Sequence, residues 1–156
     1  MEKAISSAGL LVKYAVETSI GTRPTASYIT LPGVKAIPAF GEEVNTLDYT
    51  PLSATTNKVY IKGLRDSGGA IALTVNDSKN FRTAYATMMD AYASAVAAGK
   101  QLWIEYAYPE GADMDSFYFP AEPTEIGFGG AEVDSVMENS VNLLPQGDFI
   151  FAAAST

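Results

Sequence analysis

The strongest constraint on the fold is a regular alternation of apolar and polar residues on both sides of a short glycine-containing segment, in residues 58–77 (KVYIKGLRDSGGAIALTVND). Side chains at every second position point to the same face of a β-strand, so each half is predicted to be a strand with one buried face. The residues predicted to be buried are Val59, Ile61, Ile71, Leu73 and Val75. Between them, residues 65–69 contain an aspartate and two glycines that suit a type I turn with a glycine bulge. The segment is therefore predicted to be a β-hairpin.

Most of the remaining chain also has the character of strands. Apolar, β-branched and aromatic residues predict strands at residues 9–17, 101–108, 131–145 and 149–151. Residues 115–130 predict a broken strand, with strand character at 117–119 and 126–128, because Pro120 and Pro123 interrupt it. In the strand at 131–145, one phase is apolar and contains Val133, Met137, Val141 and Leu143. That phase is predicted to pack inward.

One helix is predicted, at residues 78–98. Its apolar stripe recurs at spacings of three or four and consists of Phe81, Tyr85, Met88, Tyr92 and Val96. Asp77 or Ser78 can cap the first amides, and Gly99 can supply a left-handed terminator. The helix is therefore delimited at both ends.

A long polar connection, residues 42–57, follows a segment rich in proline and glycine, and it far exceeds the usual loop of about four to six residues. The sum of these elements predicts a mainly β fold (β+α) in a single domain spanning residues 1–156. The expected architecture is an antiparallel β-sandwich or partial barrel with one flanking α-helix at about 78–98.

Composition excludes several functions. Ten basic residues against eighteen acidic ones give a formal charge of −8, which is the wrong sign for a protein that grips nucleic-acid phosphates. The absence of histidine and cysteine removes the commonest general base, nucleophile and metal ligands. Glu110, Asp113 and Asp115 form an acidic turn whose spacing fits no calcium loop. We therefore expect no enzyme activity, no cofactor, no metal and no membrane partner.

Several segments, in one order along the chain, resemble the major tail tube protein family of long, noncontractile-tailed bacteriophages. They are AGLLVKYAVETSIGTRP, TTNKVYIKGLRDSGGAIALTVN, the single helix, LWIEYAYPEG and GGAEVDSVMENSVNLLPQGDFIF. The resemblance implies a virion structural protein whose hexameric rings stack into a tail tube, with a channel for DNA during genome ejection. It also implies tape-measure, tail terminator and distal tail proteins as partners, and assembly in the cytoplasm of a bacterial host.

The resemblance further implies roles for particular residues. The lumen-facing candidates are Glu132, Asp134, Glu138, Ser140 and Asn142, which would give the channel an acidic lining that repels DNA. The connection at 42–57 would reach the adjacent ring, with Glu43, Asn45, Asp48, Tyr49, Pro51, Leu52, Thr55 and Thr56 as candidate contacts. The two termini would be flexible arms. On the same basis, Tyr60, Lys62, Ala72 and Thr74 are candidate channel or intersubunit residues.

Two other readings stay open from the sequence. A tube subunit of a contractile tail or secretion apparatus would share the architecture but would need an outer surface that docks a sheath. A monomeric β-barrel that binds a small ligand would need a closed apolar cavity.

Overall fold

The computed structural model describes residues 4, 6, 8–39, 41, 43–66, 69–109 and 111–155. The elements in chain order are β1 (Leu11–Val16), β2 (Ile29–Thr30), β3 (Val34–Ala36), β4 (Glu43–Asp48), β5 (Tyr60–Asp66), β6 (Ile71–Asn76), α1 (Lys79–Ala97), β7 (Leu102–Ala107), β8 (Ser116–Pro123), β9 (Glu138–Pro145) and β10 (Ile150–Ala152). The mainly β fold with one helix confirms the predicted fold class.

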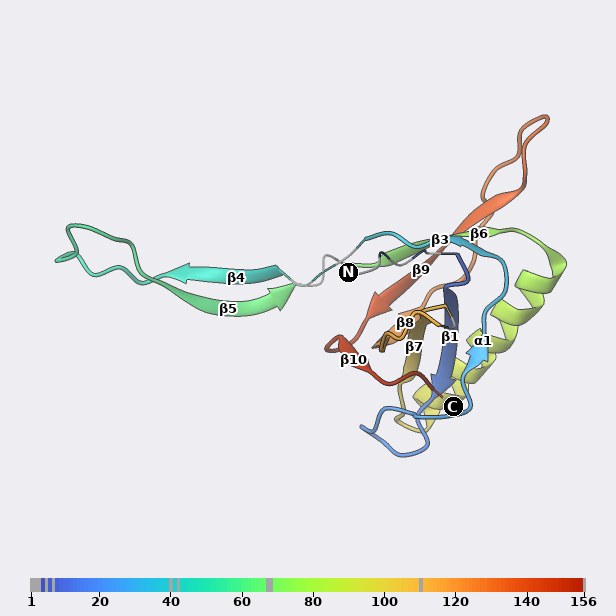
Figure 1. The fold of residues 1–156 in the computed structure, drawn as a ribbon, viewed down its shortest axis with the longest axis horizontal. Helices are drawn as coiled ribbons and strands as arrows, with labels where there is room; N and C mark the ends of the chain where they lie inside the picture. Colours follow the sequence, from blue (N-terminus) through green and yellow to red (C-terminus); the bar gives the residue numbers. More distant parts are fainter. Residues whose placement is uncertain are drawn as a thin grey trace.

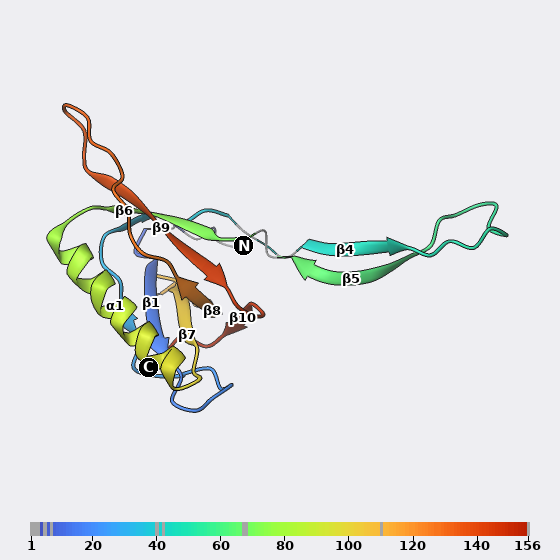
Figure 2. The same cartoon turned by 180° about the vertical axis from the view of Figure 1, so that it is seen from behind.

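One large antiparallel sheet forms the body, with strand order β2-β1-β7-β8-β9-β6-β3, and β10 pairs with β8 beyond the end of β9. The sheet curls into a half-barrel around α1 (Figures 1 and 2). Strands β4 and β5 form a separate two-stranded sheet that projects away from the body as a long ribbon (Figure 1).

The core lies between α1 and the concave face of the half-barrel. Its fully buried side chains include Phe81, Tyr85 and Met88 from the helix, packed in one cluster with residues of five strands. The strand residues of that cluster are Val12, Tyr14, Ile71, Leu73, Val75, Leu102, Ile104, Tyr106, Phe119, Ala121, Val141 and Leu143. The helix side chains therefore fill the space in which a ligand-binding barrel would keep its cavity.

Both predicted helix ends are confirmed. Ser78 is the N-cap, and its hydroxyl accepts a hydrogen bond from the Phe81 amide at 3.1 Å. Gly99 has φ +72°, and the Lys100 amide returns to the Ala95 carbonyl at 2.8 Å.

The predicted apolar stripe of the helix is wrong at its last position. Val96 is 54% exposed, whereas Ala95 is buried. At 100° per residue, a step of three from Tyr92 keeps Ala95 on the buried face and a step of four carries Val96 off it.

The predicted hairpin of residues 58–77 is wrong, although both of its strands exist. β5 pairs with β4, and β6 pairs with β9 and β3. Ile71, Leu73 and Val75 are buried as predicted, but Ile61 is exposed and Val59 is only half-buried. Of the predicted turn, Ser67 and Gly68 lie outside the described residues. Alternation identifies a strand, but it carries no information about which strand will pair with it.

The broken strand predicted over residues 115–130 is also wrong. β8 continues through Pro120 to Pro123, and residues 126–128 are not a strand. The Pro120 carbonyl accepts from the Gln146 amide at 2.9 Å. In an antiparallel strand the N–H and C=O of one residue point the same way, so the missing Pro120 donor faces the junction of β9 and β10, where the ladder is already interrupted.

β9 begins at Glu138 rather than at residue 131. A Cβ on Gly129 would lie 2.1 Å from the Glu138 carbonyl oxygen, so only glycine allows the chain to pass this close to the start of β9. Gly130 (φ +87°) and Asp134 (φ +58°) then adopt left-handed backbone conformations that end any regular strand. Residues 124–137 therefore form a projecting loop (Figure 1).

Candidate assembly surfaces

The ribbon of β4 and β5 is held together by its own backbone ladder. The register places Thr46 opposite Lys62, Leu47 opposite Ile61 and Asp48 opposite Tyr60, with an irregularity between Val44 and Thr46. Directly opposed residues share one face of a two-stranded sheet. The ribbon therefore has one face that carries Leu47 and Ile61, and another that carries Tyr60.

Large apolar side chains are exposed along the whole ribbon, on both of its faces. They are Leu47, Tyr49, Leu52, Tyr60, Ile61 and Leu64. Leu52 at the tip is fully exposed, and Leu64 is 84% exposed. An isolated two-stranded hairpin is marginally stable in water, because it has no second layer to bury its apolar side chains. This ribbon has the properties of a segment that becomes covered by another surface.

The tip of the ribbon, residues 49–59, is closed at its base by Thr50 and by the Tyr49 amide, which donates to the Val59 carbonyl at 3.1 Å. Thr50 donates from its amide (3.0 Å) and from its hydroxyl (2.6 Å) to Oδ1 of Asp48, and its hydroxyl accepts from the Val59 amide at 2.7 Å. The hydrogen bonds from Thr50 lower the pKa of Asp48. Asp48 is thus held in its ionised form where the tip joins β4.

The predicted boundaries of the long connection, residues 42–57, are wrong. Residues 43–48 are a strand, and the projecting segment extends to residue 66 rather than ending at 57. Of the predicted inter-ring contacts, Glu43, Asn45 and Asp48 lie in β4, and Tyr49, Pro51, Leu52, Thr55 and Thr56 lie at the tip. Glu42 lies outside the described residues. Leu47, Ile61 and Leu64 are exposed, which was not predicted, although apolar residues in both phases of VYIKGL argue against a hairpin with one buried face.

A second candidate surface is the face of β6 and β9 that points away from α1. The register pairs Ala72 with Asn142, Thr74 with Ser140 and Asn76 with Glu138. Lys35 on β3 forms an ion pair with Glu138. The two strands therefore present small, mostly uncharged side chains on this face, and the charge of Glu138 is compensated.

The predicted lumen-facing residues lie in two different places, some on β9 and the others in the loop 124–137. Glu138, Ser140 and Asn142 belong to β9, in the predicted phase, with Ser140 and Asn142 exposed and Val141 and Leu143 buried. Glu132 and Asp134 lie in the loop 124–137 instead, so their predicted place on the strand is wrong. In the same loop Val133 is 92% exposed and Met137 is also exposed, contrary to the predicted packing of both residues. Alternation predicts which side chains are buried only within a strand, and β9 does not begin until Glu138.

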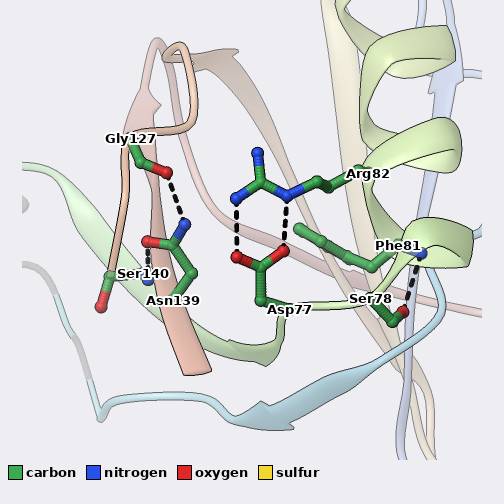
Figure 3. Close-up of polar contacts among 7 residues, drawn as sticks. All are labelled: Asp77, Ser78, Phe81, Arg82, Gly127, Asn139 and Ser140. Carbon is green, nitrogen blue, oxygen red and sulfur yellow. Dashed lines mark hydrogen bonds and ion pairs between the residues drawn. The ribbon is translucent and has the colours of Figure 1, made fainter. Parts of the chain in front are cut away.

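Asp77 joins the start of α1 to the end of β6. Its carboxylate accepts two hydrogen bonds from the Arg82 guanidinium, each at 2.6 Å, next to the Ser78 cap (Figure 3). Asn139 at the start of β9 donates to the Gly127 carbonyl at 2.6 Å and so ties the base of the loop 124–137 to β9 (Figure 3). The loop therefore has a fixed base.

We predict that Asp77→Asn lowers stability at neutral pH but not in acid. The hydrogen bond from Arg82 lowers the pKa of Asp77, so its stabilisation is present above the unfolded-state pKa of about 3.9 and is lost as pH falls through the lower folded-state value. Urea unfolding at pH 7 and at about pH 2.5 should show a difference from the unmodified protein that shrinks toward zero in acid. Asp90→Asn, on the exposed side of the same helix, is the control. An equal loss at both pH values would contradict the role of the ion pair.

The face of the sheet that α1 does not cover carries buried polar groups. Glu17 accepts from the Trp103 indole at 2.9 Å and from the Gly21 amide at 2.8 Å. Glu105 is fully buried and accepts from the Ser155 amide at 3.4 Å, and the Tyr118 hydroxyl donates to the Ala153 carbonyl at 2.7 Å. Residues 153–155 of the predicted C-terminal arm are thus held against the sheet. A flexible N-terminal arm stays a prediction, since residues 1–3, 5 and 7 lie outside the described part.

Within the described residues, no group of three or more acidic residues is placed to hold a metal ion, and Glu110 of the acidic turn lies outside them. No helix in the same part of the chain is long and apolar enough to cross a membrane.

The half-barrel with one helix on its concave face is a phage tail tube-like fold, as comparison with solved structures shows. A chain in the cryo-EM structure of the anti-feeding prophage (AFP) baseplate is 12% identical and matches with a TM-score of 0.64 over 100% of both chains. A chain in the tail of an empty GTA particle, determined with C6 symmetry, is 17% identical, with a TM-score of 0.61 over 96% of this chain and 100% of that chain.

A third similar structure comes from an extracellular contractile injection system. A chain of the PVC sheath-tube complex in the extended state is 14% identical, with a TM-score of 0.57 over 98% of this chain and 94% of that chain. No protein-family model and no curated protein matches the sequence. At these identities the likeness establishes the fold.

Proposed function

We propose that the chain is a structural subunit of a phage-like tail tube, in which copies join edge to edge into hexameric rings and the rings stack. The similar chains named above come from assembled particles, and two of these structures were determined with sixfold symmetry. The matches extend over nearly the whole length of both chains, so the proposal concerns the entire protein rather than one element. No catalytic role is proposed.

The observation that carries this proposal is the ribbon β4–β5. It exposes large apolar side chains on both faces and, among the described residues, pairs with no strand of the body. Unpaired strand edges and exposed apolar ribbons are normally avoided in monomers because they promote association. A subunit of a tube, in contrast, has to associate with other copies. The ribbon would pack on a subunit of the adjacent ring.

The outer face of β6 and β9 is proposed to line the channel, with Ser140 and Asn142 beside Ala72 and Thr74. Small uncharged side chains offer DNA no cation to bind. Of the acidic candidates, Glu138 would contribute little negative charge to the channel because Lys35 neutralises it, and Glu132 and Asp134 lie off this face in the loop at one end of β9. DNA would pass without specific contacts during genome ejection.

By extension of this proposal, the protein is a virion component assembled in the cytoplasm of a bacterial host, with tape-measure, tail terminator and distal tail proteins as partners. The noncontractile tail suggested by the sequence resemblance is one version. A tube inside a contractile apparatus is the second, and the likeness to a sheath-tube complex favours it as an alternative. The two versions differ in whether the outer surface of the tube binds a sheath.

Negative-stain electron microscopy of the purified protein tests the proposal. At rising protein concentration, we expect hollow tubes with a regular axial repeat, because the ribbon would lose its exposed apolar area only in stacked rings. Size-exclusion chromatography at low concentration should give a monomer or a single ring. A monomer at every concentration, with or without a tape-measure protein, would contradict the proposal.

A further inference from the structure

The charges of this chain are divided unevenly along the sequence. Residues 101–156 contain ten of the eighteen acidic residues and no lysine or arginine. All ten basic residues lie in residues 1–100. Three of them, Lys58, Lys62 and Arg65, lie within residues 43–66, which also contain three acidic residues, Glu43, Asp48 and Asp66. The outer part of the ribbon, residues 45–64, carries both lysines and only one acidic residue, Asp48.

The loop 124–137 is the other segment that projects from the body, and it has the opposite charge. Glu125, Glu132 and Asp134 are exposed, and no ion pair among the described residues involves them. The loop also exposes the apolar side chains of Phe128, Val133 and Val136. It therefore combines an apolar surface with three uncompensated negative charges.

The ribbon and the loop 124–137 are complementary in charge, and both expose apolar side chains. The outer part of the ribbon offers Tyr49, Leu52 and Tyr60 for apolar contact, together with Lys58 and Lys62. The two segments project from opposite sides of the body (Figures 1 and 2), so they do not meet within one copy. Complementary surfaces at opposite ends of a subunit produce a heterologous, head-to-tail contact that repeats from copy to copy.

We propose that the ribbon of one copy docks on the loop 124–137 of a second copy, with Lys58 and Lys62 facing Glu132 and Asp134. This inference rests on the proposed function, because it names the surface that receives the ribbon when rings stack. Apolar contact supplies most of the affinity, and the charges set the direction in which the copies join. The same charges oppose contact between two ribbons or between two loops, because like charges repel.

Charge exchange tests the pairing. Lys58→Glu with Lys62→Glu, or Glu132→Lys with Asp134→Lys, should each raise the protein concentration needed for tubes by about tenfold or more, through repulsion at the contact. All four substitutions together should restore assembly to near the unmodified level. The positions are exposed, and circular dichroism of each variant checks that it is folded. Loss of assembly in both pairs without restoration in the combined variant would overturn the pairing.

Cross-linking gives a second measurement, since the chain has no cysteine of its own. A variant with Leu52→Cys and Val133→Cys should form a ladder of covalent multimers when assembled tubes are oxidised, and reduction should remove it. Leu52→Cys with Ala93→Cys, on the exposed side of α1, is the control and should form no ladder. Tubes without a ladder from the first variant would overturn this inference and leave the proposed function intact. If the unmodified protein forms no tubes, the proposed function fails.

Discussion

Replacing Leu47, Ile61 and Leu64 by serine should abolish tube formation and lower the stability of the body of the folded monomer little. Leu64 is 84% exposed in the single chain, and Leu47 and Ile61 contact each other across the ribbon, outside the core of the body. In the proposed tube they become buried. Burying such a side chain contributes about 1.5–3 kcal/mol, so losing three should raise the concentration needed for assembly by roughly 1000-fold or more.

The measurement pairs thermal unfolding with sedimentation of tubes and electron microscopy. Val96→Ser is the matched control, because Val96 is a comparably exposed apolar residue on α1, away from the ribbon. The control should assemble normally. Two results would count against the ribbon as the stacking element: normal tubes from the triple variant, or a melting temperature that falls along with assembly.

Phe81→Ala should be the most damaging single substitution for stability of the folded chain. Phe81 is fully buried, stacks on Tyr85 with ring centroids 5.6 Å apart, and packs in the core cluster at the first turn of α1. Phenylalanine-to-alanine changes in a core cost about 3–5 kcal/mol, through lost burial and the cavity that is left. In a chain of this size, a loss of this magnitude lowers the melting temperature by roughly 6–20 °C.

Val96→Ala on the same helix provides the control. Val96 belongs to the apolar stripe predicted from the sequence, but it is more than half exposed in the structure. Its replacement should change the free energy of unfolding by less than about 0.5 kcal/mol. Urea denaturation of both variants measures the contrast. Equal losses would mean that α1 is rotated relative to the packing described above.

Local patterns predicted the elements of the body well. The cap at Ser78, the terminator at Gly99 and the buried phase of β6 depend on residues close together in the chain, and each is confirmed. The alternation of Val141 and Leu143 with Ser140 and Asn142 is confirmed for the same reason. A period of two or of 3.6 residues is a property of the backbone itself.

Pairing partners were not predictable in the same way. Residues 58–77 contain two good strands and a plausible turn, yet β5 pairs with a strand that precedes it and β6 pairs with β9, some seventy residues further on. Partner choice depends on which apolar faces can be buried together in three dimensions. The continuation of β8 through Pro120 was not predictable for the same reason. The proline is tolerated there because it lies where β9 ends and β10 begins along the edge of β8.

For the candidate assembly surfaces too, some features were predicted from the sequence and others were not. Local sequence patterns identified β1, β5, β6, β7, β10 and the capped helix, and the composition established the acidic balance and the absence of histidine and cysteine. They did not identify β2, β3 or β4, or the residue at which β9 begins. Only the tertiary structure decided that residues 43–66 leave the body as one ribbon, that Ile61 and Val133 are exposed rather than buried, and that Glu132 and Asp134 lie off the strand that carries Ser140. The physical reason is that secondary structure follows from local backbone geometry, whereas exposure depends on what covers a residue. In the part of the chain that the structure describes, the apolar side chains of the ribbon and of the loop 124–137 stay exposed.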